Sequence, residues 1–173
     1  VTLEENNHPA FNPAQARNVF GLDSKSDLVL MNVVHDAIGQ THYRYYQTYL
    51  NIPVENTMYI VHTANQKLLG MSGVIVTDFN ADMLQKSTAK INIQNAVDAA
   101  IKYVGAKQYM WQDAAMEQRL KNQLSNSKAS YAPVAKLVWY NAGNEVSSPE
   151  LRLAFKVDVY AKQPLSRADY FID

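Results

Sequence analysis

Hydrophobic and polar positions alternate in short stretches through the first half of the chain. Between residues 27 and 76, short apolar runs are separated by residues typical of turns, at 36–40, 55–56 and 64–67. This pattern predicts strands joined in hairpins. We therefore expect strands starting at Asp27, in the tyrosine-rich stretch from Thr41, over residues 57–62 and over residues 68–76.

A helical period replaces this alternation after a polar stretch at residues 78–90. Apolar residues recur at helical spacing over residues 93–104, with Asn92 placed to cap the first turn and Gly105 just past the last. A second, more polar helix is predicted over residues 113–124. Its apolar stripe is narrow (Met116, Leu120 and Leu124), so we expect it to lie on the surface.

The last third returns to the strand pattern. Strands are predicted over residues 134–140, 151–161 and 169–172, with a turn at 141–144. The middle strand alternates most clearly, because its odd-numbered residues are apolar from Leu151 to Val159 and its even-numbered residues are mostly polar. Pro164 interrupts hydrogen bonding before the final strand.

These elements predict an α+β fold of two consecutive units, each an antiparallel β-sheet packed with helix. Residues 1–20 form an N-terminal arm, with one helical turn expected over residues 13–20. The first domain is expected at residues 21–80 and the second at residues 85–173, on either side of the polar stretch.

Composition describes a folded chain without a charged surface field. Hydrophobic residues make up 47% of the 173 residues, and 16 basic and 16 acidic residues cancel. Nucleic acid and anionic membrane surfaces are therefore not expected partners. Cysteine is absent, and the sequence has no apolar run of the ~20 residues that a membrane helix needs. The first residues lack a targeting pattern, but the chain opens on Val1, which leaves open that a signal peptide was removed.

Motifs for catalysis are not found in the sequence. The four histidines do not form the H-E-x-x-H pattern of zinc peptidases, and neither a G-x-S-x-G motif nor a phosphate-binding glycine loop occurs. Acidic pairs such as Asp78 with Asp82 and Glu145 with Glu150 lie in polar stretches, where solvated carboxylates are the ordinary case. We therefore expect no catalytic residue, metal site or cofactor in this chain.

The tyrosine-rich stretch carries the strongest local signal. Alternation places Tyr43, Tyr45, Gln47 and Tyr49 on one face of a strand, and His42, Arg44 and Tyr46 on the other. For the tyrosines, packing within the sheet is favoured over a stacking platform for a ligand. His42 and Arg44 are neighbours on their face and could together hold a carboxylate or a backbone carbonyl. For this pair, a polar tie within the sheet is favoured over contact with a partner. Trp111 and Trp139 are expected to be core or interface anchors.

The same stretch resembles a known family motif, H-x-R-x-x-Q-x-Y-x-G-I-P-V, found in the propeptides of fungalysin and thermolysin. The matching residues are His42, Arg44, Gln47, Tyr49, Ile52, Pro53 and Val54, followed by Gly73 at the end of a later strand. Asn51 and Asn56 replace common glycines of that family, and both can adopt positive φ.

The second half resembles the PepSY-type domain that follows in such propeptides. The similarity rests on the predicted helix from Asn92, the strand over residues 151–161 and a P-x-S-R-x-x-Y-F-I-D ending. Together the two resemblances imply a cystatin-like and PepSY-like fold. They also imply a processing junction near Arg167, Tyr170, Phe171 and Asp173, with a blocking segment beyond Asp173.

As a function, the resemblance implies the propeptide of a secreted zinc metalloendopeptidase, which assists folding of the catalytic domain and inhibits it. The expected partner is the cognate catalytic domain, which would hold the zinc, and the expected location is extracellular or periplasmic. Two alternatives remain open: a free-standing secreted protease inhibitor or regulatory module, and a non-catalytic surface binding module. An H-E-x-x-H encoded downstream would favour the propeptide, whereas a stop codon would exclude it.

Overall fold

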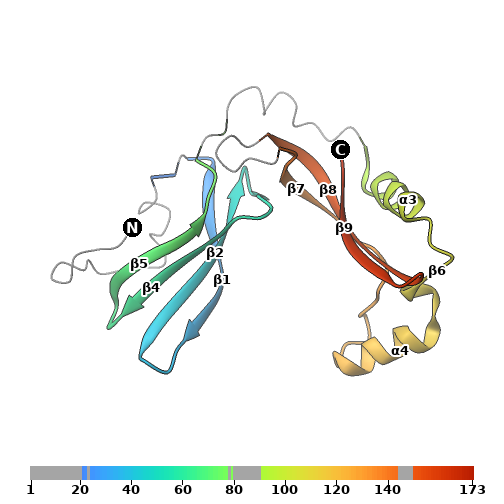
Figure 1. Ribbon diagram of the computed structural model, residues 1–173, viewed down its shortest axis with the longest axis horizontal. Helices are drawn as coiled ribbons and strands as arrows, with labels where there is room; N and C mark the ends of the chain where they lie inside the picture. Colours follow the sequence, from blue (N-terminus) through green and yellow to red (C-terminus); the bar gives the residue numbers. More distant parts are fainter. Residues whose placement is uncertain (1–20, 23, 78, 80–90, 144–149) are drawn as a thin grey trace. The chain divides into compact units, whose positions relative to one another are not determined.

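The computed structural model describes residues 21–22, 24–77, 79, 91–143 and 150–173. The chain divides into two compact units, one comprising residues 1–83 with 141–151 and the other residues 84–140 with 152–173. Each contains one β-sheet (Figure 1). The α+β class predicted from the sequence is confirmed, since the described residues form two antiparallel sheets and two α-helices.

The first unit is built on a five-stranded antiparallel sheet. Four of its strands follow the order β1-β2-β4-β5 (Figure 1). The fifth, the short β3, pairs with β2. Its strands are β1 (Ser26–His35), β2 (Gln40–Tyr49), β3 (Ile52–Pro53), β4 (Met58–Ala64) and β5 (Lys67–Val74). The predicted strands are thus confirmed, with ends shifted by one or two residues. The described part of this unit contains no helix, and the helical turn predicted over residues 13–20 lies outside the described residues.

Residues with positive φ form several of the turns between these strands. Asn51 and Asn56 have φ values of 63° and 59°, so each adopts the left-handed conformation expected where the family has glycine. The β4–β5 turn also takes positive φ, at Asn65 and Gln66.

Leu28, Tyr45, Val61 and Leu68 form the buried apolar cluster of the first unit. The predicted packing role of the tyrosine face is therefore confirmed for Tyr45.

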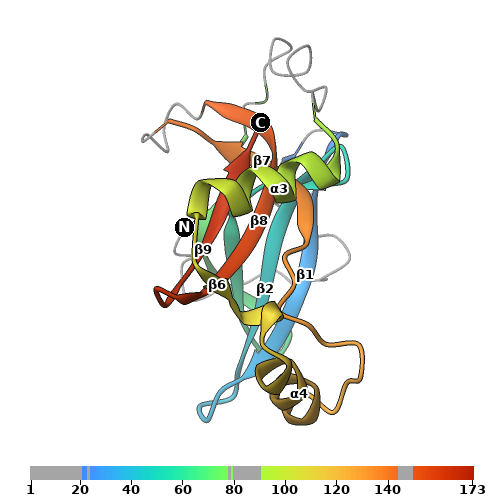
Figure 2. The same cartoon turned by 90° about the vertical axis from the view of Figure 1, so that its right-hand side faces the viewer.

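The second unit has a four-stranded sheet with the order β6-β8-β7, and β9 also pairs with β8 (Figure 2). Its elements are α3 (Ile93–Val104), β6 (Gln108–Tyr109), the 3-10 helix η2 (Met110–Gln112), α4 (Ala114–Gln123), β7 (Ala135–Asn141), β8 (Leu151–Gln163) and β9 (Ser166–Ile172). The short β6 and η2 were not predicted. The final strand starts at Ser166, three residues before the predicted start at residue 169. Its first residues are exposed, so no alternation of apolar and polar positions marked them as a strand.

Helix α3 packs on one face of this sheet because its inward positions are small (Figure 2). Ala96 and Ala100 are fully buried against Phe155, Val157 and Val159. The helix begins as predicted, with Asn92 Oδ1 accepting the Asn95 N–H at 2.8 Å, and ends at Gly105 with φ 57°. This is the helix-on-sheet packing predicted for the second unit.

Helix α4 lies on the surface, as predicted, and none of its residues is buried. Asp113 caps it by accepting the N–H groups of Ala115 and Met116, and also bonds Lys162 at the end of β8. The Lys162 contact is the main cause that lowers the pKa of Asp113. Capping and ion pairing therefore attach the first turn of α4 to the sheet.

Candidate functional site

The motif residues of the first sheet occupy two faces of β2, as the alternation predicts. Tyr45, Gln47 and Tyr49 are buried on one face, and His42 and Arg44 are half-buried on the other. Pro53 pairs with Thr48 in the short β3, and Val54 is 3% exposed. Gly73 pairs with Tyr59 near the end of β5. The motif therefore contributes mainly to the construction of the sheet.

Gln47 makes the most extensive buried polar contact of this set. Its side chain is completely buried, and its amide both donates to the Val76 carbonyl at 2.6 Å and accepts the Val76 N–H at 2.8 Å. The Gln47 backbone N–H is bound by Thr57 Oγ1, whose hydroxyl donates to the Val54 carbonyl. The Gln47 side chain thus bonds both the N–H and the carbonyl of Val76, as a neighbouring strand would, and so holds the segment after β5 against the sheet.

Tyr49 and Tyr45 show how differently two buried tyrosines on one face can be placed. Tyr49 stacks on Phe79 with ring centroids 3.9 Å apart and planes 2° apart. Tyr45 is 1% exposed, and its hydroxyl has no hydrogen-bond partner among the described residues. Burial raises the pKa of Tyr45 to about 12. Both rings therefore serve packing, in agreement with the sequence-based interpretation.

On the opposite face of β2, His42 lies between two partners. Its Nε2 is 3.1 Å from Asp36 Oδ2, and its Nδ1 is 2.8 Å from Nδ1 of His62 on β4. His62 Nε2 is 3.1 Å from Ser72 Oγ on β5. A backbone hydrogen bond from Gln40 is the largest cause that lowers the pKa of Asp36. The predicted tie to a carboxylate is therefore present for His42.

Arg44 does not share this tie, which corrects the expectation that His42 and Arg44 hold one group together. Its Nε is buried and has no hydrogen-bond partner among the described residues. Asp36, His62 and Ser72 were not predicted as neighbours of His42, because their proximity depends on strand register, which pairs His42 with His62 directly. An Asx turn at Asp36 and a histidine on each strand of a hairpin were the available signals.

The residues predicted near a processing junction lie on both faces of β9. Tyr170 faces the helix side, where it packs against the core cluster and contacts Tyr103 at 5.7 Å between centroids. Arg167 and Phe171 lie on the other face, opposite Tyr160 and Lys156 of β8. Asp173 pairs with Arg152 at 3.5 Å. Strand alternation thus separates Tyr170 from the other three residues.

The face of the second sheet opposite α3 combines aromatic rings with ion pairs. Tyr140 stacks on Phe171 at 4.0 Å, and Tyr131 meets Tyr160 edge-on at 5.4 Å. Arg167 lies over the Tyr160 ring and binds Asp158, and Lys156 pairs with Asp169. We call this set the aromatic face: Tyr131, Tyr140, Lys156, Asp158, Tyr160, Arg167, Asp169 and Phe171. Its charged side chains are partly exposed, so it is accessible to a partner.

Of the two ion pairs on the aromatic face, Arg167 with Asp158 has the shorter contact. The Arg167 guanidinium donates from Nε and Nη2 to the Asp158 carboxylate, at 3.0 Å and 2.6 Å for the closest contacts. This contact is the largest cause that lowers the pKa of Asp158 and raises the pKa of Arg167. Both groups therefore stay charged at neutral pH, and their fork geometry fixes the Arg167 plane against Tyr160.

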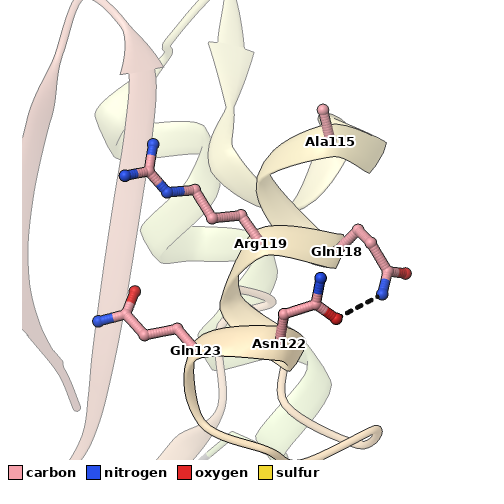
Figure 3. Close-up of a pocket in the computed structure, with 5 residues that line it drawn as sticks. All are labelled: Ala115, Gln118, Arg119, Asn122 and Gln123. Carbon is pink, nitrogen blue, oxygen red and sulfur yellow. Dashed lines mark hydrogen bonds between the residues drawn. The ribbon is translucent and has the colours of Figure 1, made fainter.

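Other surface features carry little chemistry. An open depression on α4 is lined by Ala115, Gln118, Arg119, Asn122 and Gln123, and Figure 3 shows Gln118 engaged with Asn122. Within the described part of the chain, no three His, Cys, Asp or Glu side chains are arranged to hold a metal ion. Nor is any helix among the described residues long and apolar enough to cross a membrane.

Comparison with known proteins gives one family. No curated protein matches the chain. Residues 26–74 match the family model of the Fungalysin/Thermolysin Propeptide Motif, which spans β1 to β5 and includes His42, Gln47 and Gly73. This is a propeptide motif and not a catalytic domain. The first sheet is therefore the part of the chain that supports its assignment as a metalloprotease propeptide.

Proposed function

We propose that the chain is the propeptide of a secreted zinc metalloendopeptidase of the thermolysin or fungalysin type, acting as a folding aid and inhibitor of its catalytic domain. The observation that carries this proposal is the motif match over residues 26–74. On this proposal, residues 21–80 form the propeptide-motif domain and residues 85–173 a PepSY-like domain. The zinc belongs to the partner, and the chain acts outside the cytoplasm.

The aromatic face is the surface through which we propose that the catalytic domain binds. Tyrosine, phenylalanine and arginine are enriched in protein interfaces, and tyrosine and arginine are enriched among the residues that contribute most to binding energy. Here the rings are stacked and the ion pairs formed within the unit, so fewer side chains have to be ordered on binding. A sheet face of this kind suits a protease–inhibitor interface of about 1,600 Å² in total.

Binding to the catalytic domain encoded in the same reading frame tests both parts of the proposal. The Phe171→Ala variant removes a stacked ring from the aromatic face, and we expect it to weaken binding about 30-fold, a loss typical of an interface anchor. Affinity is measured by calorimetry with an active-site-inactivated protease, and inhibition by a peptide-cleavage assay.

Tyr103→Ala is the matched control, because Tyr103 is an aromatic residue on α3 that is 80% exposed. We expect this control to bind like the wild-type chain. If both variants bind equally well, the aromatic face is not the interface. If the wild-type chain does not bind the protease at all, the propeptide function itself is wrong.

A further inference from the structure

Four polar side chains of the first sheet form a continuous hydrogen-bonded chain that the motif match does not explain. The chain runs from Asp36 in the β1–β2 turn through His42 on β2 and His62 on β4 to Ser72 on β5, with contacts of 3.1, 2.8 and 3.1 Å. The two imidazole rings meet edge to face, with planes 75° apart. Three neighbouring strands are thus connected through two titratable rings.

The direction of each hydrogen bond at neutral pH follows from Asp36. Its Oδ1 accepts the N–H groups of Ile38 and Gln40, so the ionised carboxylate accepts at Oδ2 from His42 Nε2–H. A neutral His42 then has its lone pair on Nδ1, and His62 must donate its Nδ1–H to it. His62 Nε2 is left as the acceptor of the Ser72 hydroxyl.

Protonation affects this chain in two unequal steps. With one added proton, His62 Nε2 donates to Ser72 and one hydrogen remains between the two Nδ1 atoms, so only the contact to Ser72 reverses, because the Ser72 hydroxyl can accept as well as donate. With a second proton, two N–H donors would oppose each other across the 2.8 Å contact and two positive charges would lie side by side. The geometry of the folded pair therefore accommodates one added proton and opposes the second.

Among the described residues, the side chains around His42 and His62 do not offset the repulsion that opposes a second proton. Asp36 provides one carboxylate, which is already engaged, and Arg44 adds a positive charge on the same face of β2. The positions paired with the two histidines on the outer strands are Val34 on β1 and Gly70 on β5, and neither can be ionised. His35, on the other face of β1, is bonded to Thr41 and stands outside the chain.

We propose that the His42–His62 pair is an acid-sensitive tie between β2 and β4, which stabilises the first sheet at neutral pH and loosens it in mild acid. The unfolded chain binds a proton on each histidine, whereas the folded pair binds one. Acid therefore favours opening of the sheet. This inference concerns the stability of the first unit and holds whether or not the chain acts as a propeptide.

The sign agrees with the ionisation of His62. Burial is the main cause that lowers the pKa of His62 from 6.5, and the charge on His42 lowers it further. A histidine whose pKa is lower in the folded state contributes stability above its unfolded value, and that stability is lost as the pH falls below 6.5. The lowered pKa of Asp36 acts in a separate range, below 3.8.

Hydrogen exchange of the full chain tests the proposal, with the second sheet as an internal reference. Between about pH 7.5 and about pH 5, a range in which histidine titrates, protection factors of β2 and β4 amides are expected to show a several-fold loss relative to β8 amides. The His62→Asn variant keeps a donor toward His42 but cannot be protonated, so its loss should be smaller. The control His35→Asn should retain the wild-type loss.

Nitrogen-15 NMR of the wild-type chain provides a second test that needs no variant. At about pH 7.5 we expect the proton of His62 on Nδ1 and that of His42 on Nε2, and we expect His62 to protonate only below 6.5, the ordinary histidine value. The opposite tautomers, or protonation of His62 at or above 6.5, would overturn the proposal. So would equal acid sensitivity of the wild-type chain and the His62→Asn variant.

Discussion

Replacing Gly73 with alanine is expected to destabilise the first sheet by about 3 kcal/mol or more, the range of a strained backbone combined with a steric clash. Gly73 has φ 131°, which a residue with a side chain rarely adopts. A Cβ at this position would lie 2.1 Å from the Met58 carbonyl oxygen and 2.8 Å from Tyr59 Cα. These atoms are backbone of the paired strand β4, so they cannot move without disturbing the sheet.

The effect can be measured by urea unfolding, followed through the amide resonances of the first sheet. Gly39→Ala is the matched control, because Gly39 also has positive φ, at 81°, but has nothing within 4 Å of its Cβ position. We expect this control to cost about 1 kcal/mol, the strain of the left-handed conformation alone. Equal losses for the two variants would show that close packing against β4 is not why glycine is needed at position 73.

Replacing Gln47 with leucine should cost about 2 to 4 kcal/mol, since two buried backbone groups lose their partners at once. Leucine has a similar size, but it can neither donate to the Val76 carbonyl nor accept the Val76 N–H. The segment that follows β5 is then expected to detach from the sheet. The same urea experiment measures the loss, and faster hydrogen exchange at Val76 reports the detachment.

Gln94→Leu is the matched control, because it removes a glutamine amide that is not buried. Gln94 is exposed on α3 and donates to Asp98 one turn later. Surface changes of this kind usually alter stability by less than about 0.5 kcal/mol. If Gln47→Leu lowers the free energy of unfolding no more than Gln94→Leu does, the two hydrogen bonds between Gln47 and Val76 do not stabilise the sheet as proposed.

Local sequence signals predict most of the elements because their causes are local. Helix α3 follows from Asn92, Gly105 and an apolar face of small residues, and each of these acts within one or two turns. The turns on either side of β3 and the β4–β5 turn contain asparagines with positive φ, and the β1–β2 turn contains Gly39. The ends of β8 and β9 were less predictable, because the hairpin between them is exposed and polar.

The candidate site was predictable only in part, because its contacts join residues far apart in the chain. The faces of β2 follow from alternation, which places Gln47 inside and His42 outside. That His42 meets His62 depends on the register of β2 with β4. Likewise, the stacking of Phe171 on Tyr140 requires the order of β7, β8 and β9, which alternation within one strand does not reveal.

The proposed role in folding is tested most directly by refolding the cognate catalytic domain in vitro. The denatured domain is diluted into buffer with an excess of the chain or with an equal amount of an unrelated protein, and the folded product is quantified by size-exclusion chromatography. We predict that folded catalytic domain forms in good yield only with the chain and elutes bound to it. The same yield of active, unbound enzyme under both conditions would contradict the account.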